Sequence, residues 1–109
     1  MARVVRSSLA RKSLNEIGRY IASESGSRSV ALRFLDSIEE KCRIYATQPL
    51  MGGARPDLGR NVRCFPIGNH VVLYRPLDEG IELLLVVHGA RDIPALYRRL
   101  FGRREQAEE

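Results

Sequence analysis

The sequence predicts an α+β fold in which an antiparallel helical hairpin packs on one face of a small, mainly antiparallel sheet. Three observations lead to this class. A short β-prone segment, residues 2–6, opens the chain, and two stretches with apolar residues every three or four positions follow it. Three β-prone segments joined by tight turns come next, and a last, short helix is expected to begin after Asp92. The first strand is expected at or near a sheet edge.

Each helical stretch has a single apolar stripe and a suitable N-terminal cap. Ser7 or Ser8 can cap the first helix, and Ser27 can cap the second, which ends near Thr47. The spacing of the apolar positions is that of one helix face, and the two stripes are Ala10, Leu14, Ile17, Ile21 and then Ala31, Phe34 or Leu35, Ile38, Cys42, Tyr45. The connection at residues 25–27 is so short that the helices should pack antiparallel.

The three later strands are expected at residues 62–67, 70–75 and 81–87. The Gly68-Asn69 pair and residues 78–80 supply the turn chemistry. Pro76 is expected to end the middle strand, since proline has no N–H to donate to a neighbouring strand. Residues 81–87 are apolar except for Glu82, which favours a central strand covered on both faces.

Length and composition indicate one domain, residues 1–101, and a polar tail, residues 102–109, that is expected to be disordered. A formal charge of +5 predicts an anionic partner, either nucleic acid or an acidic protein. No apolar run approaches the ~20 residues that span a bilayer, and no signal peptide is recognisable, so a cytoplasmic location is expected. Two cysteines make neither a disulfide framework nor a zinc site, and no metal or cofactor is expected.

No strong catalytic motif is present: the chain has no Gly-rich phosphate loop, no metal-binding His/Glu spacing and no nucleophile elbow. The segment 48–61, with two prolines and three glycines, cannot be a regular helix and is either functional or a simple connection. The candidate residues are a polar group on the predicted sheet and its flanking loops, namely Arg55, Arg60, Arg63, His70, Arg75, His88, Arg91 and Tyr97.

Among these, His88 could act as a general base near neutral pH, but a hydrogen-bonding structural role is the favoured interpretation. Arg91 either braces the start of the last helix or faces a phosphate, and Asp92 is expected to cap that helix. Arg63 and Arg75 are expected to point to solvent from an uncovered sheet face, where they could bind an anion. Without interleaved aromatic residues, binding of a specific nucleic-acid sequence is not expected.

Four segments, taken in order, resemble ParE-type toxins of the RelE/ParE superfamily over roughly residues 4–96. They are A-R-K-S-L-N-E-I-G-R-Y-I-A, Q-P-L-M-G-G-A-R-P-D-L-G, V-R-C-F-P-I-G-N-H-V-V-L-Y-R-P and V-V-H-G-A-R-D. The resemblance implies the toxin of a bacterial type II toxin–antitoxin system, of the kind associated with plasmid stabilisation. It also implies a hetero-oligomer with a ParD-like antitoxin, whose C-terminal segment wraps the toxin, and DNA gyrase as the target. The family's R-P-D-L-G and H-G-A-R-D segments correspond to residues 55–59 and 88–92.

The residues themselves favour the gyrase-inhibiting branch over the RNA-cleaving one. RNA cleavage needs a base, an acid and cations at the phosphate, yet the chain has lysine only at Lys12 and Lys41, both on predicted helices. A ribosome-dependent ribonuclease that uses His88, Arg91 and Tyr97 is the alternative, and an inactive toxin fold that only binds antitoxin is a third. The residues expected to contact a target or partner are Arg55, Arg63, Arg75, His88, Arg91 and Tyr97, and Arg91 with the final helix is expected to contribute to target contact. Given the positive charge of the chain, the antitoxin should be acidic.

Overall fold

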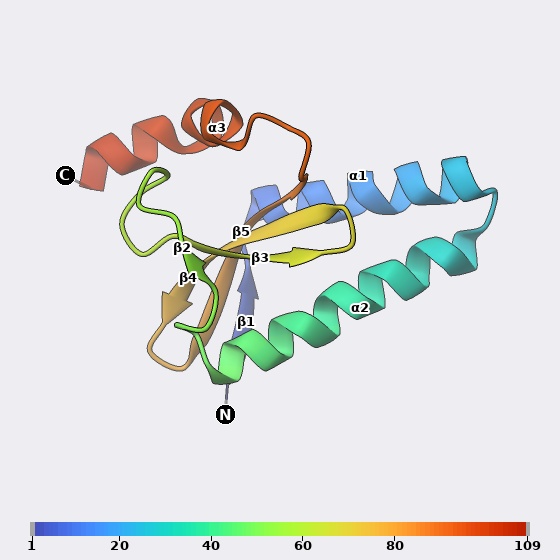
Figure 1. The fold of residues 1–109 in the computed structure, drawn as a ribbon, viewed down its shortest axis with the longest axis horizontal. Coiled ribbons are helices and arrows are strands. Elements are labelled where there is room, and N and C mark those ends of the chain that lie inside the picture. Colours follow the sequence, from blue (N-terminus) through green and yellow to red (C-terminus); the bar gives the residue numbers. More distant parts are fainter. Residues whose placement is uncertain (1, 109) are drawn as a thin grey trace.

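The computed structural model describes the backbone of residues 2–108 and the side chains of residues 2–102, and Figure 1 shows its fold. The predicted helices and strands follow one another in the predicted order, and a two-residue strand, β2, that the sequence did not predict lies between α2 and β3. Their bounds are β1 Arg3–Arg6, α1 Ser8–Ser25, α2 Arg28–Thr47, β2 Gly53–Ala54, β3 Arg63–Ile67, β4 His70–Leu77, β5 Gly80–His88 and α3 Ile93–Glu108. The disorder expected for residues 102–109 stays a prediction. No side chain after Gly102 is among the described residues.

The five strands form one mixed sheet in the order β1-β5-β4-β3-β2. β1 lies at an edge, as predicted, and pairs in parallel with β5, whereas the other three pairings are antiparallel. Two strands that pair in parallel need a long connection between them, and here the α1–α2 hairpin together with β2, β3 and β4 lies between β1 and β5 in sequence. The fold class is therefore the predicted one.

The helical hairpin covers one face of the sheet and buries the predicted stripes. Ser7 and Ser27 are the N-caps, each accepting a hydrogen bond from a backbone N–H three residues later. Gly26 ends α1 with a φ of 68°, a left-handed conformation that glycine adopts without strain. The core between hairpin and sheet consists of Ala10, Ile38, Cys42, Ala46, Phe65, Val72, Tyr74, Ile81, Leu83 and Val86, with Leu14, Ile17, Leu35 and Tyr45 packed against it.

The opposite face of the sheet is also covered, because α3 folds back across it (Figure 1). The second core joins α3 and the segment before β3 to the outer side chains of β4 and β5, and consists of Leu58, Val62, Leu73, Leu84, Leu85, Val87, Ile93, Tyr97 and Phe101. The prediction that β5 is covered on both faces is confirmed. The expectation of an uncovered sheet face for Arg63 and Arg75 is wrong, because both faces are covered and the two arginines lie on opposite faces. Arg63 pairs with Tyr74 of the first core, whereas Arg75 follows Tyr74 along β4 and lies on the face that α3 covers.

Two local features differ from the sequence prediction. Strand β4 runs through Pro76 to Leu77, and Pro76 pairs with Ile81. Because β3 pairs with β4 only as far as Tyr74, Pro76 has a single neighbouring strand, a position that tolerates proline. The ladder between β4 and β5 also shifts at Leu73/Tyr74, where Leu84 is the extra residue of a β-bulge.

Within the residues that the structure describes, no helix is both long and apolar enough to cross a bilayer.

Candidate functional site

A groove of about 550 Å³ runs between α1, the C-terminal half of β5 and α3. Its apolar floor and walls come from all three elements and consist of Leu9, Ile17, Leu85, Val86, Val87, Leu96 and Leu100. Polar side chains around this apolar surface are Lys12, Ser13, Glu16, Tyr20, His70, His88, Arg91 and Arg99. The groove brings together three of the candidate residues, His70, His88 and Arg91.

The groove exists because β1 is shorter than its neighbour. β1 pairs with β5 only to Leu83, while β5 continues to His88. Beyond Leu83 the start of α1 takes the place of a strand. The Ser7 hydroxyl donates to the Leu84 carbonyl at 3.1 Å, and the buried Ser13 hydroxyl accepts from the Val86 N–H at 3.1 Å. These bonds hold α1 against the edge of β5, which leaves the last residues of that strand at the bottom of a cleft.

His88 ends β5 and is tied to the turn that follows it. The Nδ1 atom of His88 accepts a hydrogen bond from the Ala90 N–H at 3.1 Å, and the His88 carbonyl accepts one from the Arg91 N–H at 3.0 Å. In the neutral imidazole the proton therefore sits on Nε2. A neutral His88 in this arrangement has its Nε2–H available as a donor, and its basic nitrogen, Nδ1, is already engaged by the backbone.

His70 lies directly across the sheet from His88. The two residues are partners in the β4–β5 ladder, and their ring centroids are 5.3 Å apart in an edge-to-face arrangement. The other side of the His70 ring packs on Phe34 of α2, with centroids 5.3 Å apart. Burial lowers the pKa of His70, and the adjacent His88 lowers it further. The groove thus contains both histidines of the chain.

The charges around the groove are mostly positive. Lys12, Arg91 and Arg99 are exposed and face a single carboxylate among the lining residues, that of Glu16. The sequence placed Lys12 on a predicted helix and singled out neither Glu16 nor Arg99 as a site residue. A signal for Arg99 existed, because it lies in the last predicted helix beside the apolar positions Leu96 and Leu100 that also line the groove.

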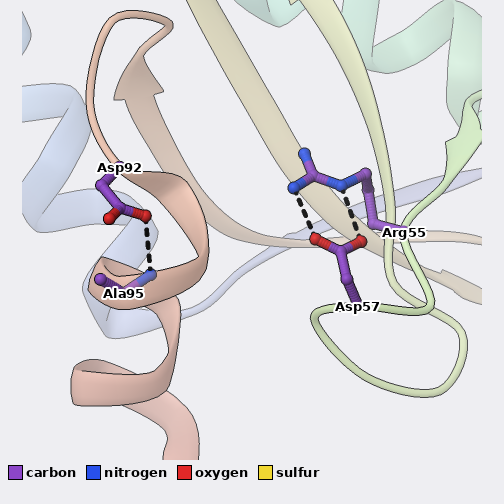
Figure 2. Close-up of polar contacts among 4 residues, drawn as sticks. All are labelled: Arg55, Asp57, Asp92 and Ala95. Atoms are coloured by element: carbon purple, nitrogen blue, oxygen red, sulfur yellow. Dashed lines mark hydrogen bonds and ion pairs between the residues drawn. The ribbon is translucent and has the colours of Figure 1, made fainter.

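Three other predicted residues lie away from the groove and are engaged within the fold. The Arg55 guanidinium forms a two-pronged ion pair with Asp57, at 3.0 and 2.8 Å, as Figure 2 shows. The same pairing lowers the pKa of the Asp57 carboxyl. Arg63 donates to the carbonyls of Leu50 and Gly52 at 3.1 and 2.7 Å. Arg75 faces Glu82 across the ladder near the opposite end of β5.

Arg60, the remaining arginine of the polar group, is exposed and does not line the groove.

Tyr97 belongs to the second core rather than to the surface. Its side chain is 1% exposed and stacks on Phe101 with ring centroids 4.5 Å apart. In this arrangement neither a substrate nor a partner reaches its ring, so the geometry assigns it a packing role. Asp92 is the helix cap that the sequence predicts, because its Oδ1 accepts a hydrogen bond from the Ala95 N–H at 3.2 Å (Figure 2).

The chemistry available in the groove is that of binding. Exposed cations around an apolar floor attract an anionic segment that also carries apolar side chains. Among the described residues, no group of three His, Cys, Asp or Glu side chains is placed to hold a metal ion. The side chains of the groove that could serve as a general base for RNA cleavage are the Glu16 carboxylate, His88 once its bond to Ala90 is broken, and His70, which is partly buried between His88 and Phe34.

Comparisons with known proteins agree with this fold. A family model described as ParE toxin of type II toxin-antitoxin system, parDE, matches residues 4–93. A solved structure titled chromosomal ParDE TA system from P. aeruginosa superposes with a TM-score of 0.67 at 19% sequence identity, covering 81% of this chain and 96% of that one. A search of curated proteins found no match. Since the family model covers most of the chain, this protein belongs to the ParE toxin family of type II toxin–antitoxin systems.

Proposed function

We propose that this ParE-type toxin inhibits DNA gyrase through protein–protein contact and is neutralised when an acidic segment of its antitoxin binds the groove between α1 and α3. Its place of action is then the bacterial cytoplasm, where gyrase works. This proposal deepens the family assignment in two respects, the target and the surface that the antitoxin covers.

The observation that carries the choice of gyrase is the state of the residues on which RNA cleavage would depend. His88 has its Nδ1 atom engaged by Ala90, and Tyr97 is buried against Phe101. Of the three residues in the ribonuclease alternative, His88 and Arg91 are exposed and line the groove, but the Nδ1 atom of His88 is held by the Ala90 N–H. Cleavage by 2′-hydroxyl attack requires a positioned base and acid as well as cations. The groove offers the cations, and this supports binding without cleavage.

Charge and shape of the groove support an acidic, amphipathic antitoxin segment. Its lining has three exposed cations against one carboxylate, around an apolar floor formed by β5. A segment with apolar residues on one side and carboxylates on the other would bury its apolar residues against the floor of the groove and place its carboxylates near the cations. The chain as a whole has a formal charge of +5, which would steer an acidic partner toward it.

Two assays on the purified, folded protein test the proposed target. One follows DNA supercoiling by gyrase and the trapping of DNA breaks, and the other follows messenger cleavage on translating ribosomes. We expect inhibited gyrase and intact messenger. Cleaved messenger with unaffected gyrase would move the protein to the ribonuclease branch, and inactivity in both assays would identify an inactive toxin fold.

Neighbouring arginines on α3 provide a matched test of the antitoxin surface. Arg98 and Arg99 are both exposed, but only Arg99 lines the groove. Arg99→Ala should weaken binding of the antitoxin encoded beside the toxin by about 1 kcal/mol or more, whereas Arg98→Ala should change it much less, because a charge outside the interface acts only at long range. Equal effects of the two variants on the dissociation constant would contradict the proposed surface.

A truncation before Ile93 is a poor test of the role of α3 in target contact. Ile93, Tyr97 and Phe101 are part of the second core, so their removal would expose the sheet face that they cover. Substitutions of exposed α3 residues separate target contact from folding, and the expected contribution of Arg91 to that contact is tested in the same way.

A further inference from the structure

Both histidines of the chain meet at one end of the groove and separate it from a second hollow. The second hollow, of about 300 Å³, is formed by the turns on either side of the pair and is lined by Pro66, Gly68, Asn69, His70, Val71, His88, Gly89 and Ala90. Both imidazoles therefore line two depressions, and a side chain that extends along the groove would reach them at its end.

The surroundings give the two rings different roles. The Nδ1 atom of His88 accepts from the Ala90 N–H, so the neutral ring presents Nε2–H as a donor, and a second proton on Nδ1 would break the bond to Ala90. Burial lowers the pKa of His70, and the neighbouring His88 lowers it further. His70 is therefore neutral near pH 7 while the groove is empty. Its contact with the Phe34 ring would favour the charged form once it is created.

The charged groups around the pair favour an incoming carboxylate. α1 contributes Lys12 and Glu16, the turn after β5 contributes Arg91, and α3 contributes Arg99. From α2 the contact is the uncharged ring of Phe34, and the residues of the second hollow add no titratable group besides the histidines. A carboxylate within about 4–6 Å of an imidazole raises its pKa, and this charge pattern would draw one to that position.

We propose that His70 and His88 form a carboxylate subsite of the groove, in which His88 donates its Nε2–H to an acidic side chain of a bound peptide segment while His70 takes up one proton. The proton comes from solvent, a single N–H bond forms on His70, and no bond in the peptide breaks. The inference rests on the proposed function in one respect, namely that the occupant of the groove is an acidic segment of a protein.

Proton uptake makes the affinity depend on pH with a defined sign. Binding raises the pKa of His70, so the affinity is highest below the pKa of the free protein and falls as the pH rises through the pKa of the complex. The loss amounts to about tenfold in dissociation constant for each unit by which binding raises that pKa.

The test measures binding of a short amphipathic peptide of Leu, Ala and Glu between about pH 5.5 and pH 8.5, the range in which an imidazole titrates. With the wild-type chain we expect the affinity to fall about tenfold over this range. His70→Gln should abolish the pH dependence. His88→Ala should weaken binding at every pH but keep the dependence, because it removes the donor and leaves the His70 ring.

A second measurement avoids substitutions altogether. The ring-proton resonances of His70, followed by NMR with and without the peptide, should report a pKa that rises by about one unit on binding. An unchanged pKa of His70, or a His70→Gln variant that keeps the full pH dependence, would overturn the subsite.

Failure of this inference and failure of the proposed function give different results. Peptide binding that does not vary with pH removes the histidine subsite but leaves the groove as a docking surface for an acidic segment. If the peptide does not bind and a short single-stranded oligonucleotide does, both the subsite and the proposed occupant of the groove are overturned.

Discussion

Replacing Tyr74 by Phe removes one buried hydroxyl that holds the segment after α2 in place. Tyr74 is fully buried, and its hydroxyl accepts from the Gly52 N–H at 3.0 Å and donates to the Pro49 carbonyl at 2.7 Å. The Phe side chain keeps the ring contacts with Tyr45 and Phe65, so the change isolates the two hydrogen bonds. Each net bond is worth about 1 kcal/mol, and a buried donor left without a partner costs about 1–3 kcal/mol. We expect the variant to lose about 2–3 kcal/mol of unfolding free energy.

Equilibrium unfolding in urea, followed by circular dichroism, measures this loss as a lower midpoint at an unchanged slope. Tyr20→Phe is the matched control, since the Tyr20 side chain is 60% exposed and its hydroxyl can bond to water. The control should stay within about 0.5 kcal/mol of the wild type. A Tyr74→Phe variant that loses no more than this control would refute the assignment of the hydroxyl as the clamp of residues 49–52.

Three further predictions follow from individual contacts. The pKa of Asp57, measured by NMR of its carboxyl carbon, should lie below the ordinary aspartate value and rise toward that value in Arg55→Ala. Because the pKa is lowered in the folded protein, the ion pair is present at neutral pH and is lost as the pH falls through that pKa. Burial raises the pKa of Cys42 to about 12, so in a Cys64→Ser variant the remaining thiol should react with a disulfide reagent only after unfolding; rapid reaction of the folded protein would contradict this. Asp92→Ala should lower the unfolding free energy by about 1 kcal/mol, as expected for a lost helix cap, and an unchanged urea midpoint would contradict that role.

Local sequence signals were sufficient to predict most of the fold. The serine caps, the Gly26 break and the apolar stripes fix the hairpin, and the tight turns at Gly68 and Gly80 fix the order of β3, β4 and β5. The expectations that Pro76 ends β4 and that Arg75 points to solvent from an uncovered face failed for a common reason. Both depend on which elements are neighbours in space, namely how far β3 reaches and where α3 folds back.

The candidate site could be predicted only in part. His88 and Arg91 follow a buried strand, which marks them as candidates from sequence alone. The pairing of His70 with His88 depends on the bulge at Leu84, because without that extra residue His70 would lie opposite Val87. No local pattern in β5 predicts the bulge. Ser7 and Ser13 form hydrogen bonds with the edge of β5 at and beside the bulge, and these are tertiary contacts that local sequence does not reveal.

The family match stops at residue 93, yet α3 forms one wall of the groove through Leu96, Arg99 and Leu100. This wall lies beyond the matched residues, and Arg99 has to be tested directly. The same holds for the second core, where Tyr97 and Phe101 secure α3 against the sheet.

The measurement that tests the central claim most directly is gyrase supercoiling in the presence of the folded wild-type protein and of His88→Ala, with messenger cleavage followed on ribosomes in parallel. If the protein acts by contact with gyrase, both forms inhibit supercoiling to a similar extent and the messenger stays intact. Messenger cleavage by the wild type that His88→Ala reduces by about 100-fold or more, as expected for loss of a general base, would contradict the account and identify the protein as a ribonuclease.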